Sequence, residues 1–134
     1  MPEAILSDYF YGDESEQFVF FKIPCQLITD PKFKHISTDA KLLYGMLLDR
    51  MSLSAKHGWY DDTGRVYIYY TVDEICGDMV CGRDKAIKLL AELDNKRGIG
   101  LIERVRQGLG RPSKIYVKRF TTRTAPPKPA SPPP

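Results

Sequence analysis

The sequence predicts one α+β domain in which helices precede a short β-hairpin. Its 134 residues, 43% of them apolar, are enough to bury a single hydrophobic core. Apolar residues recur at helical spacing in 37–54 and 83–95. Two alternating runs, 101–106 and 113–118, flank the turn-forming stretch QGLGRP. Helices followed by a hairpin are typical of the α+β class.

The domain is expected to span residues 18–120 and to lie between two segments of different composition. Residues 1–17 are acidic, carry a few aromatic side chains and show no periodicity, so they are predicted to form a loose arm. Residues 121–134 are rich in proline, which predicts an extended, semi-rigid linker. We expect this linker to lead to a further domain that this sequence does not contain.

The first part of the domain is expected to hold one strand and little helix. The run FVFFKI at Phe18–Ile23 is aromatic and β-branched and ends at Pro24, which predicts a strand. Because Pro24 and Pro31 interrupt the chain before Ile36, any helix there should be one or two turns long. An exposed edge as apolar as Phe18–Phe21 would invite pairing with a second chain, which predicts a homodimer that covers Val19 and Phe21. The alternative, that this run covers the domain's own core as one strand of the wing sheet, explains Phe20 and Ile23.

The clearest helix is predicted over Ser37–Ser54. Ser37 or Thr38 can accept hydrogen bonds from the free N–H groups of the first turn, and the charge of Asp39 complements the helix dipole. Gly45 lies inside this helix and costs about 1 kcal/mol relative to alanine. Its presence indicates a close packing contact.

A loop and a strand are predicted to separate this helix from the next one. The stretch HGWYDDTGR at His57–Arg65 carries turn-forming residues, and Val66–Thr71 reads as a strand. Thr71 and Glu74 have the spacing of a capping box, which predicts a short helix that ends near Met79.

The last helix is predicted over Arg83–Asn95, directly after a tight turn at Gly82. Its apolar residues follow the i, i+3, i+4, i+7 rule and should face the core: Ala86, Leu89, Leu90 and Leu93. Strands at Leu101–Arg106 and Ser113–Lys118 should then form the hairpin.

Charge is distributed unevenly along the chain. The formal net charge is only +3, but residues 1–20 contain five acidic residues and no Lys or Arg. Residues 81–120 contain eleven basic residues against four acidic ones, a net charge of +7. Such an asymmetry predicts a polyanionic partner for the C-terminal half of the domain.

The predicted order of helix, strand, short helix, tight turn, second helix and basic hairpin is that of a winged helix-turn-helix DNA-binding domain. In this design the second helix enters the major groove of double-stranded DNA, and the hairpin, or wing, meets phosphates or the minor groove. The predicted DNA-binding residues are Arg83, Lys85, Lys88, Arg104, Arg106, Gln107, Arg111, Lys114 and Tyr116. Arg104, Arg106, Lys114, Tyr116 and Lys118 are expected to share the solvent face of the hairpin. The alternative role for each cation is to keep the protein soluble, and the alternative role for Tyr116 is packing within the sheet.

The residues expected of an enzyme or a metal protein are missing from the sequence. His35 and His57 stand in unlike contexts, and no P-loop motif occurs, so we predict no catalytic activity and no cofactor. Cys76 and Cys81 lack the His or third Cys of a zinc site, so we predict no bound metal. The sequence Asp61-Asp62 is interpreted as a turn.

The odd number of cysteines and the absence of a signal peptide indicate reduced thiols in the cytoplasm. No apolar run approaches the ~20 residues needed to cross a bilayer, so a membrane partner is not expected.

Five segments, in order, resemble the N-terminal domain of RepA_N plasmid replication initiators. These segments are Phe20–Pro24, Ser37–Ser54, Gly64–Ile75, Lys85–Leu93 and Gly100–Phe120. The resemblance implies a dimer that binds repeated origin sequences (iterons), and a C-terminal DnaD-like domain that contacts host replication proteins. Residues 1–17 and 76–84 depart from the family pattern, so the resemblance does not identify the DNA target.

Two other functions share this architecture. A transcriptional repressor can have the same winged fold, because the fold does not dictate the function. A winged helix can also bind proteins, although such domains usually lack a helix and a wing that are both basic.

Overall fold

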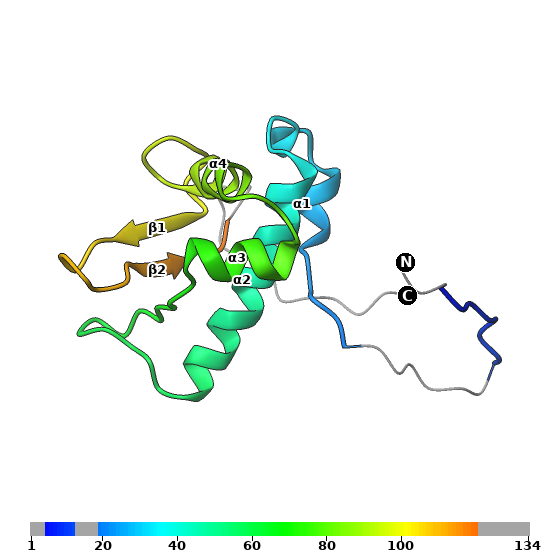
Figure 1. Ribbon diagram of the computed structural model, residues 1–134, viewed down its shortest axis with the longest axis horizontal. Coiled ribbons are helices and arrows are strands. Elements are labelled where there is room, and N and C mark those ends of the chain that lie inside the picture. The colour runs from blue at the N-terminus through cyan, green and yellow to red at the C-terminus, as the bar shows by residue number, and fades with distance from the viewer. Residues whose placement is uncertain (1–4, 13–18, 121–134) are drawn as a thin grey trace, which may run out of the picture.

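The computed structural model describes residues 5–12 and 19–120 (Figure 1). Three helices and a two-stranded antiparallel sheet follow two short helical turns. The elements are α1 (Cys25–Thr29), the 3-10 helix η1 (Pro31–Phe33), α2 (Thr38–Lys56), α3 (Val72–Met79), α4 (Arg83–Leu93), β1 (Ile102–Val105) and β2 (Lys114–Val117). The α+β fold class is therefore confirmed, and residues 5–12 form neither helix nor strand.

Helix α2 runs through the middle of the domain, and α4 packs against both α2 and α3 (Figure 1). The core is formed by apolar side chains from all of these elements, including Leu43, Leu47, Ile75, Leu90, Leu93, Ile102 and Ile115. Tyr44 is also fully buried, and its hydroxyl donates a hydrogen bond of 2.6 Å to the carbonyl of Lys118. Burial raises the pKa of Tyr44 to about 12, so this phenol stays protonated and holds the end of the hairpin against α2.

The ends of α2 and α3 follow the predicted capping. The hydroxyl of Ser37 accepts a hydrogen bond from the backbone N–H of Ala40 at the start of α2. The side chains of Thr71 and Glu74 form the predicted capping box at the start of α3. Helix α4 ends at Leu93, two residues before the predicted end, because Asp94 adopts an extended conformation.

Gly45 makes the close contact that its position in α2 indicated. A Cβ atom at this position would lie 2.7 Å from Cγ1 of Ile23 and 3.2 Å from the carbonyl oxygen of Lys22. Segment 22–23 therefore crosses α2 at a distance that only glycine allows, and Ile23 packs against the core.

The strand predicted at Phe18–Ile23 is wrong for residues 19–23, and Phe18 lies outside the described residues. Residues 19–24 form no ladder, and Val19, Phe20 and Phe21 are exposed. The backbone of this segment packs on α2 at Gly45 instead of pairing with the sheet. Aromatic and β-branched residues favour a strand only where a sheet edge is available to receive them.

The strand predicted at Val66–Thr71 is reduced to isolated bridges. Ile68 and Ile115 exchange two backbone hydrogen bonds of 2.9 Å, which attach this segment to β2. The ladder proper joins β1 to β2, with Ile102 opposite Val117 and Val105 opposite Lys114. The segment around Ile68 thus takes the place of a third strand without continuous pairing.

Candidate nucleic-acid interface

Helices α3 and α4 form a helix-turn-helix unit whose turn is short. Helix α3 ends at Met79, and its C-cap residue Val80 has a left-handed conformation with φ 53°. A β-branched residue rarely adopts this conformation. Gly82, two residues later, is the N-cap of α4, so α4 begins at Arg83 directly after the turn.

The cations predicted on α4 all lie on its exposed side. A guanidinium nitrogen of Arg83 lies 3.0 Å from a carboxylate oxygen of Asp73. The ammonium of Lys85 lies 2.7 Å from Asp39 of α2, and this hydrogen bond raises the pKa of Lys85. Exposed ion pairs of this kind contribute little to stability because solvent screens them, so a phosphate group can replace either carboxylate.

Lys88 has no hydrogen bond or ion pair with any residue that the structure describes. Ile87 is exposed beside Lys88. It was not among the DNA-binding residues predicted from the sequence, because all of those were polar. An exposed apolar side chain on a reading helix can contact the methyl group of thymine.

Arg104 does not lie on the solvent face of the hairpin, as was predicted. Its Nε donates a hydrogen bond of 2.7 Å to a carboxylate oxygen of Asp94, which is buried, and its Nη2 forms an ion pair of 2.6 Å with the same oxygen. Asp94 follows the last residue of α4, and Arg104 lies in β1. The pair therefore ties the wing to the end of the reading helix.

Tyr116 is also buried, so its predicted place on the solvent face is wrong and packing in the sheet explains it. Its hydroxyl donates a hydrogen bond of 3.0 Å to Asp61, and the guanidinium of Arg65 lies 4.6 Å from its ring centre. Burial alone would raise the pKa of Asp61, but hydrogen bonds from Thr63 and Arg65 outweigh it and lower this pKa. The carboxylate of Asp61 thus fixes a turn, as its sequence context indicated.

Lys114 and Gln107 are engaged within the hairpin region. The ammonium of Lys114 lies 4.4 Å from the ring centre of Tyr67. The side-chain amide of Gln107 donates hydrogen bonds to the carbonyl of Pro112 at 2.7 Å and to the hydroxyl of Tyr69 at 3.3 Å. These contacts hold the base of the loop that joins β1 to β2.

The tip of the wing carries the remaining predicted cations. Arg106 and Arg111 are exposed, and neither forms an ion pair or side-chain hydrogen bond within residues 5–12 and 19–120. Leu109 lies between them at the apex and is fully exposed. The sequence reasoning missed Leu109, although its position between two glycines was a usable signal.

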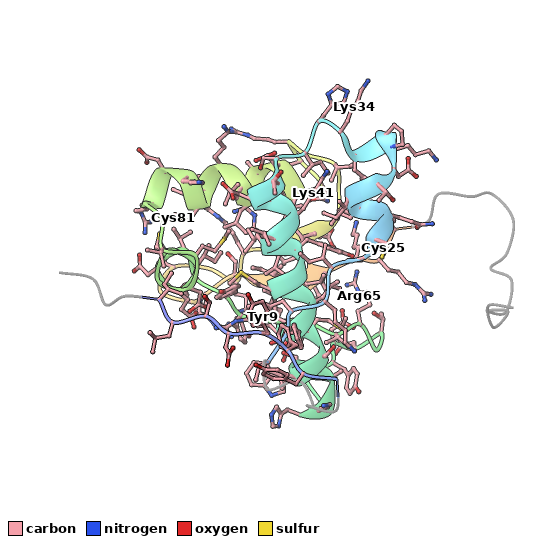
Figure 2. All side chains as sticks on the ribbon, turned by 90° about the vertical axis from the view of Figure 1, so that its right-hand side faces the viewer. Tyr9, Cys25, Lys34, Lys41, Arg65 and Cys81 are labelled. Carbon is pink, nitrogen blue, oxygen red and sulfur yellow. The ribbon has the colours of Figure 1, made fainter. Side chains whose placement is uncertain are left out.

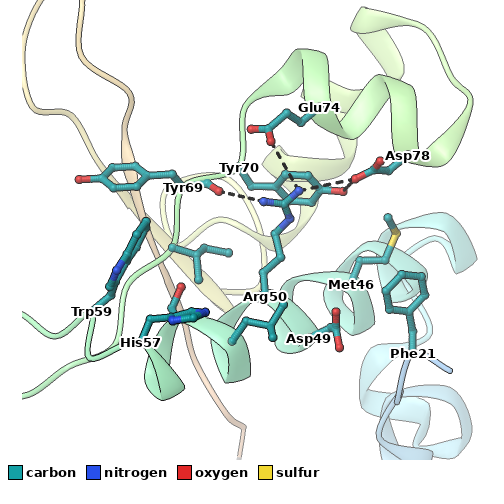
Figure 3. Close-up of a pocket in the computed structure, with 13 residues that line it drawn as sticks. Phe21, Met46, Asp49, Arg50, His57, Trp59, Tyr69, Tyr70, Glu74 and Asp78 are labelled. Atoms are coloured by element: carbon teal, nitrogen blue, oxygen red, sulfur yellow. Dashed lines mark hydrogen bonds and ion pairs between the residues drawn. The ribbon is translucent and has the colours of Figure 1, made fainter. Parts of the chain in front are cut away.

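A cavity of about 550 Å³ opens between α2, the segment before α3, and α3 itself (Figure 3). Arg50 occupies its centre, with its guanidinium 3.9 Å from the ring centre of Tyr70 and 3.5 Å from the carboxylate of Glu74. Asp78 accepts a short hydrogen bond from the hydroxyl of Tyr70. Arg50 therefore braces α2 against α3, and this cavity is not lined by the cations predicted to bind DNA.

The thiols and acidic side chains of the described residues are not arranged as a metal site. These residues contain no group of three His, Cys, Asp or Glu side chains placed to hold a metal ion. Cys25 is exposed, and Cys76 and Cys81 are half-buried free thiols. Within the same part of the chain, no helix is both long enough and apolar enough to span a bilayer.

The helix-turn-helix of α3 and α4, followed by the β1–β2 hairpin, makes this a winged helix-turn-helix domain. Residues 19–128 match the family RepA_N, described as the N-terminus of replication initiator protein A (RepA), and the chain belongs to this family. The match confirms the resemblance found in the sequence and extends beyond the predicted domain boundary at residue 120.

Several known proteins are similar to this chain. It is 28% identical over 105 residues to a 41 kDa protein of Lactobacillus helveticus, a match that covers 74% of this chain and 29% of that relative. Similar solved structures include an N-terminal domain of a DNA binding protein, with a TM-score of 0.66, 28% identity and coverage of 89% of this chain and 88% of that one. A Rep–DNA complex has a TM-score of 0.65, 29% identity and coverage of 87% and 88%. An MDR initiator has a TM-score of 0.61, 32% identity and coverage of 78% and 81%.

Proposed function

We propose that this domain binds repeated origin sequences (iterons) in double-stranded DNA, as the DNA-binding part of a replication initiator of a plasmid or related mobile element. The observation that carries the proposal is the set of exposed cations on α4 and the wing tip. Arg83 and Lys85 form only exposed ion pairs, and Lys88, Arg106 and Arg111 form none with the described residues. Membership of the RepA_N family and the likeness to a Rep–DNA complex support an initiator over a repressor.

The proposed docking places the N-terminal turn of α4 in the major groove and the wing over the neighbouring phosphates. Arg83 and Lys88 would reach base edges or phosphates from α4, whereas Arg106 and Arg111 would contact the backbone from the wing. Arg104 and Tyr116 would act indirectly, because their contacts with Asp94 and Asp61 position the hairpin. This function needs neither catalysis nor a cofactor, and we propose that the protein lies in the cytoplasm together with the DNA that it binds.

Replacing Arg106 and Arg111 together with alanine is expected to weaken binding to all duplexes alike. The slope of log K against log salt concentration should fall by about one unit for each phosphate that the wing no longer neutralises. Fluorescence anisotropy with a labelled duplex at several salt concentrations measures this slope. Lys34→Ala serves as the control, because it removes an exposed cation directly after η1 (Figure 2), on the other side of the domain from the β1–β2 hairpin (Figure 1). An unchanged slope in the double variant would show that the wing stands clear of DNA.

Arg83→Ala is expected to change discrimination among sequences, in contrast to the wing variant. A bidentate contact of arginine with guanine is worth about 1–3 kcal/mol against the wrong base. Binding is measured on a selected site and on the same site with single base-pair changes. Asp73→Ala, which removes the partner of Arg83 but keeps the cation, should retain the site preference. If Arg83→Ala keeps both affinity and preference, the proposed orientation of α4 is wrong.

We propose further that the domain forms a homodimer through an apolar surface composed of Val19, Phe21, Leu53 and Trp59. All four side chains are exposed, and Phe21, Leu53 and Trp59 line the same cavity between α2 and α3. A two-fold dimer would cover this surface and place two α4 helices on neighbouring half-sites. Contacts with host replication proteins, which the family resemblance assigns to a separate domain, are proposed to lie outside residues 19–120.

Sedimentation velocity at micromolar concentration is expected to show a dimer, with or without DNA. Phe21→Asp should shift the protein to a monomer, because it places a charge in the proposed apolar contact. Ile99→Asp, at an exposed apolar position in the α4–β1 connection, should leave the dimer intact. A wild-type protein that remains monomeric in both conditions would contradict the proposal.

A further inference from the structure

The apex of the wing presents a large apolar side chain that the domain does not use. Leu109 is fully exposed and packs against nothing in the described part of the chain. Its neighbours Gly108 and Gly110 have φ angles of 115° and 76°. These conformations favour glycine, and no atom beyond the adjoining residues lies within 4 Å of the position that a Cβ would take at either glycine. The two glycines therefore shape a turn that places the side chain of Leu109 at its apex, between Arg106 and Arg111.

We propose that Leu109 is an apolar wedge that enters the minor groove beside the site of α4 and unstacks one base step, so that binding bends the DNA. This inference rests on the proposed duplex binding, but it assigns a further activity, local deformation of the duplex, to the tip. Leucine is among the side chains that architectural proteins insert between base pairs from the minor groove.

The tip is held in place before any ligand binds. The amide of Gln107 donates a 2.7 Å hydrogen bond to the carbonyl of Pro112 and so closes the loop below Leu109. The same amide reaches the hydroxyl of Tyr69 at 3.3 Å, which fixes the loop to the segment before α3. The backbone N–H of Arg111 donates to the carbonyl of Gly108 at 3.3 Å across the turn itself. A wedge that is already ordered loses less conformational entropy when it inserts.

The charges around Leu109 favour a nucleic acid as the group that receives it. The sequence contains no acidic residue between positions 104 and 120, and Arg106 and Arg111 flank the tip without a partner in the described residues. A protein surface that accepted Leu109 would also have to neutralise these two arginines. A minor groove offers phosphates on both sides and an apolar gap between base pairs at one site.

The properties of the duplex also predict which kind of base-pair step Leu109 should unstack. A narrow minor groove in A·T-rich DNA attracts arginine, and pyrimidine–purine steps such as TA are the easiest to unstack. We therefore expect the wedge to act at a pyrimidine–purine step in an A·T-rich part of the site, outside the base pairs read by α4.

The test uses the whole 134-residue chain and a duplex that this protein selects from a random-sequence library. Each adenine under the wing footprint is replaced in turn by 2-aminopurine, whose fluorescence rises when it unstacks. Wild-type protein should raise the signal several-fold at one step, Leu109→Ala should abolish the rise, and Leu109→Phe should keep it. Energy transfer between dyes at the duplex ends should report a smaller bend for Leu109→Ala.

Two further readouts separate a wedge from a merely structural residue. The thermal midpoint of Leu109→Ala should equal that of the wild type, because Leu109 makes no packing contact in the described structure. The slope of log K against log salt concentration should also stay unchanged, since no charge is removed.

Several results would overturn the wedge. If wild-type protein binds its site but 2-aminopurine stays silent at every position, the wedge is wrong while duplex binding stands. Equal signals from wild type and Leu109→Ala would overturn it in the same way. If Leu109→Ala changes sedimentation and not the DNA signals, the tip is a protein contact. If no duplex is selected and none binds in a salt-dependent manner, the proposed function fails together with the wedge.

Discussion

Replacing Asp94 with alanine is expected to lower the free energy of unfolding by about 3–5 kcal/mol, the usual cost of breaking a buried ion pair by removing one partner. Asp94 is only 4% exposed, and one of its oxygens accepts a hydrogen bond from Nε of Arg104 and forms an ion pair with its Nη2. Its other oxygen accepts from the backbone N–H of Lys96. Without the carboxylate, the half-buried guanidinium of Arg104 would be left unpaired between α4 and β1.

The ion pair between Asp94 and Arg104 also predicts that the domain becomes less stable to unfolding in acid. Burial alone would raise the pKa of Asp94, but hydrogen bonds from Arg104 and from the backbone outweigh burial, and the pKa lies below its usual value. The ionised form therefore stabilises the fold above the unfolded pKa of about 3.9. This contribution is lost as the pH falls through the lower, folded-state pKa. Asp94→Asn should be less stable at neutral pH and should lose less stability on acidification.

Urea unfolding at pH 7 and at several acidic pH values measures both effects. The matched control is Asp39→Ala, which breaks the exposed ion pair with Lys85 and should cost no more than about 1 kcal/mol. Because Asp94 and Arg104 join the end of α4 to the wing, Asp94→Ala should also weaken duplex binding under conditions where it remains folded. Equal costs for the Asp94 and Asp39 variants would show that the pair between α4 and β1 is not a structural anchor.

The helices were predictable because their signals are local. The hydroxyls of Ser37 and Thr71 cap α2 and α3 as their sequence context indicated, and the apolar spacing of 83–95 places the core face of α4 correctly. Strands were less predictable because a strand requires a partner. The runs 18–23 and 66–71 have similar compositions, yet among their described residues only Ile68 pairs with the backbone of β2.

Charge could be predicted for the region but not for the individual residues. Arg104 and Arg106 are two positions apart and look alike in the sequence, yet Arg104 is paired with a buried carboxylate and Arg106 is exposed. What distinguishes them is the turn after Leu93, which brings Asp94 beside β1. No spacing rule shows that a residue after a helix will meet the third residue of the next strand.

The turn after Leu93 also depends on Gly98. Replacing Gly98 with alanine is expected to destabilise the domain by about 3 kcal/mol or more. A Cβ atom at this position would lie 2.0 Å from the carbonyl oxygen of Glu92 and 2.4 Å from that of Ala91. Both atoms belong to the backbone of the last turn of α4, so neither can rotate away as a side chain would. The 3.0 Å hydrogen bond from the N–H of Ile99 to the carbonyl of Glu92 holds the chain against the end of α4, and it would have to break to make room for the Cβ.

Gly77→Ala is the matched variant and should have the opposite sign. Gly77 lies in α3, and nothing lies within 4 Å of the position of an added Cβ. Alanine there should stabilise the protein by about 0.5–1 kcal/mol through its higher helix propensity. Thermal and urea unfolding of both variants measure the two effects. Because the turn at Gly98 sets the distance between α4 and the wing, Gly98→Ala should also bind duplex DNA more weakly at temperatures where it is folded. A Gly98→Ala protein as stable as Gly77→Ala would mean that the chain can leave α4 by another route.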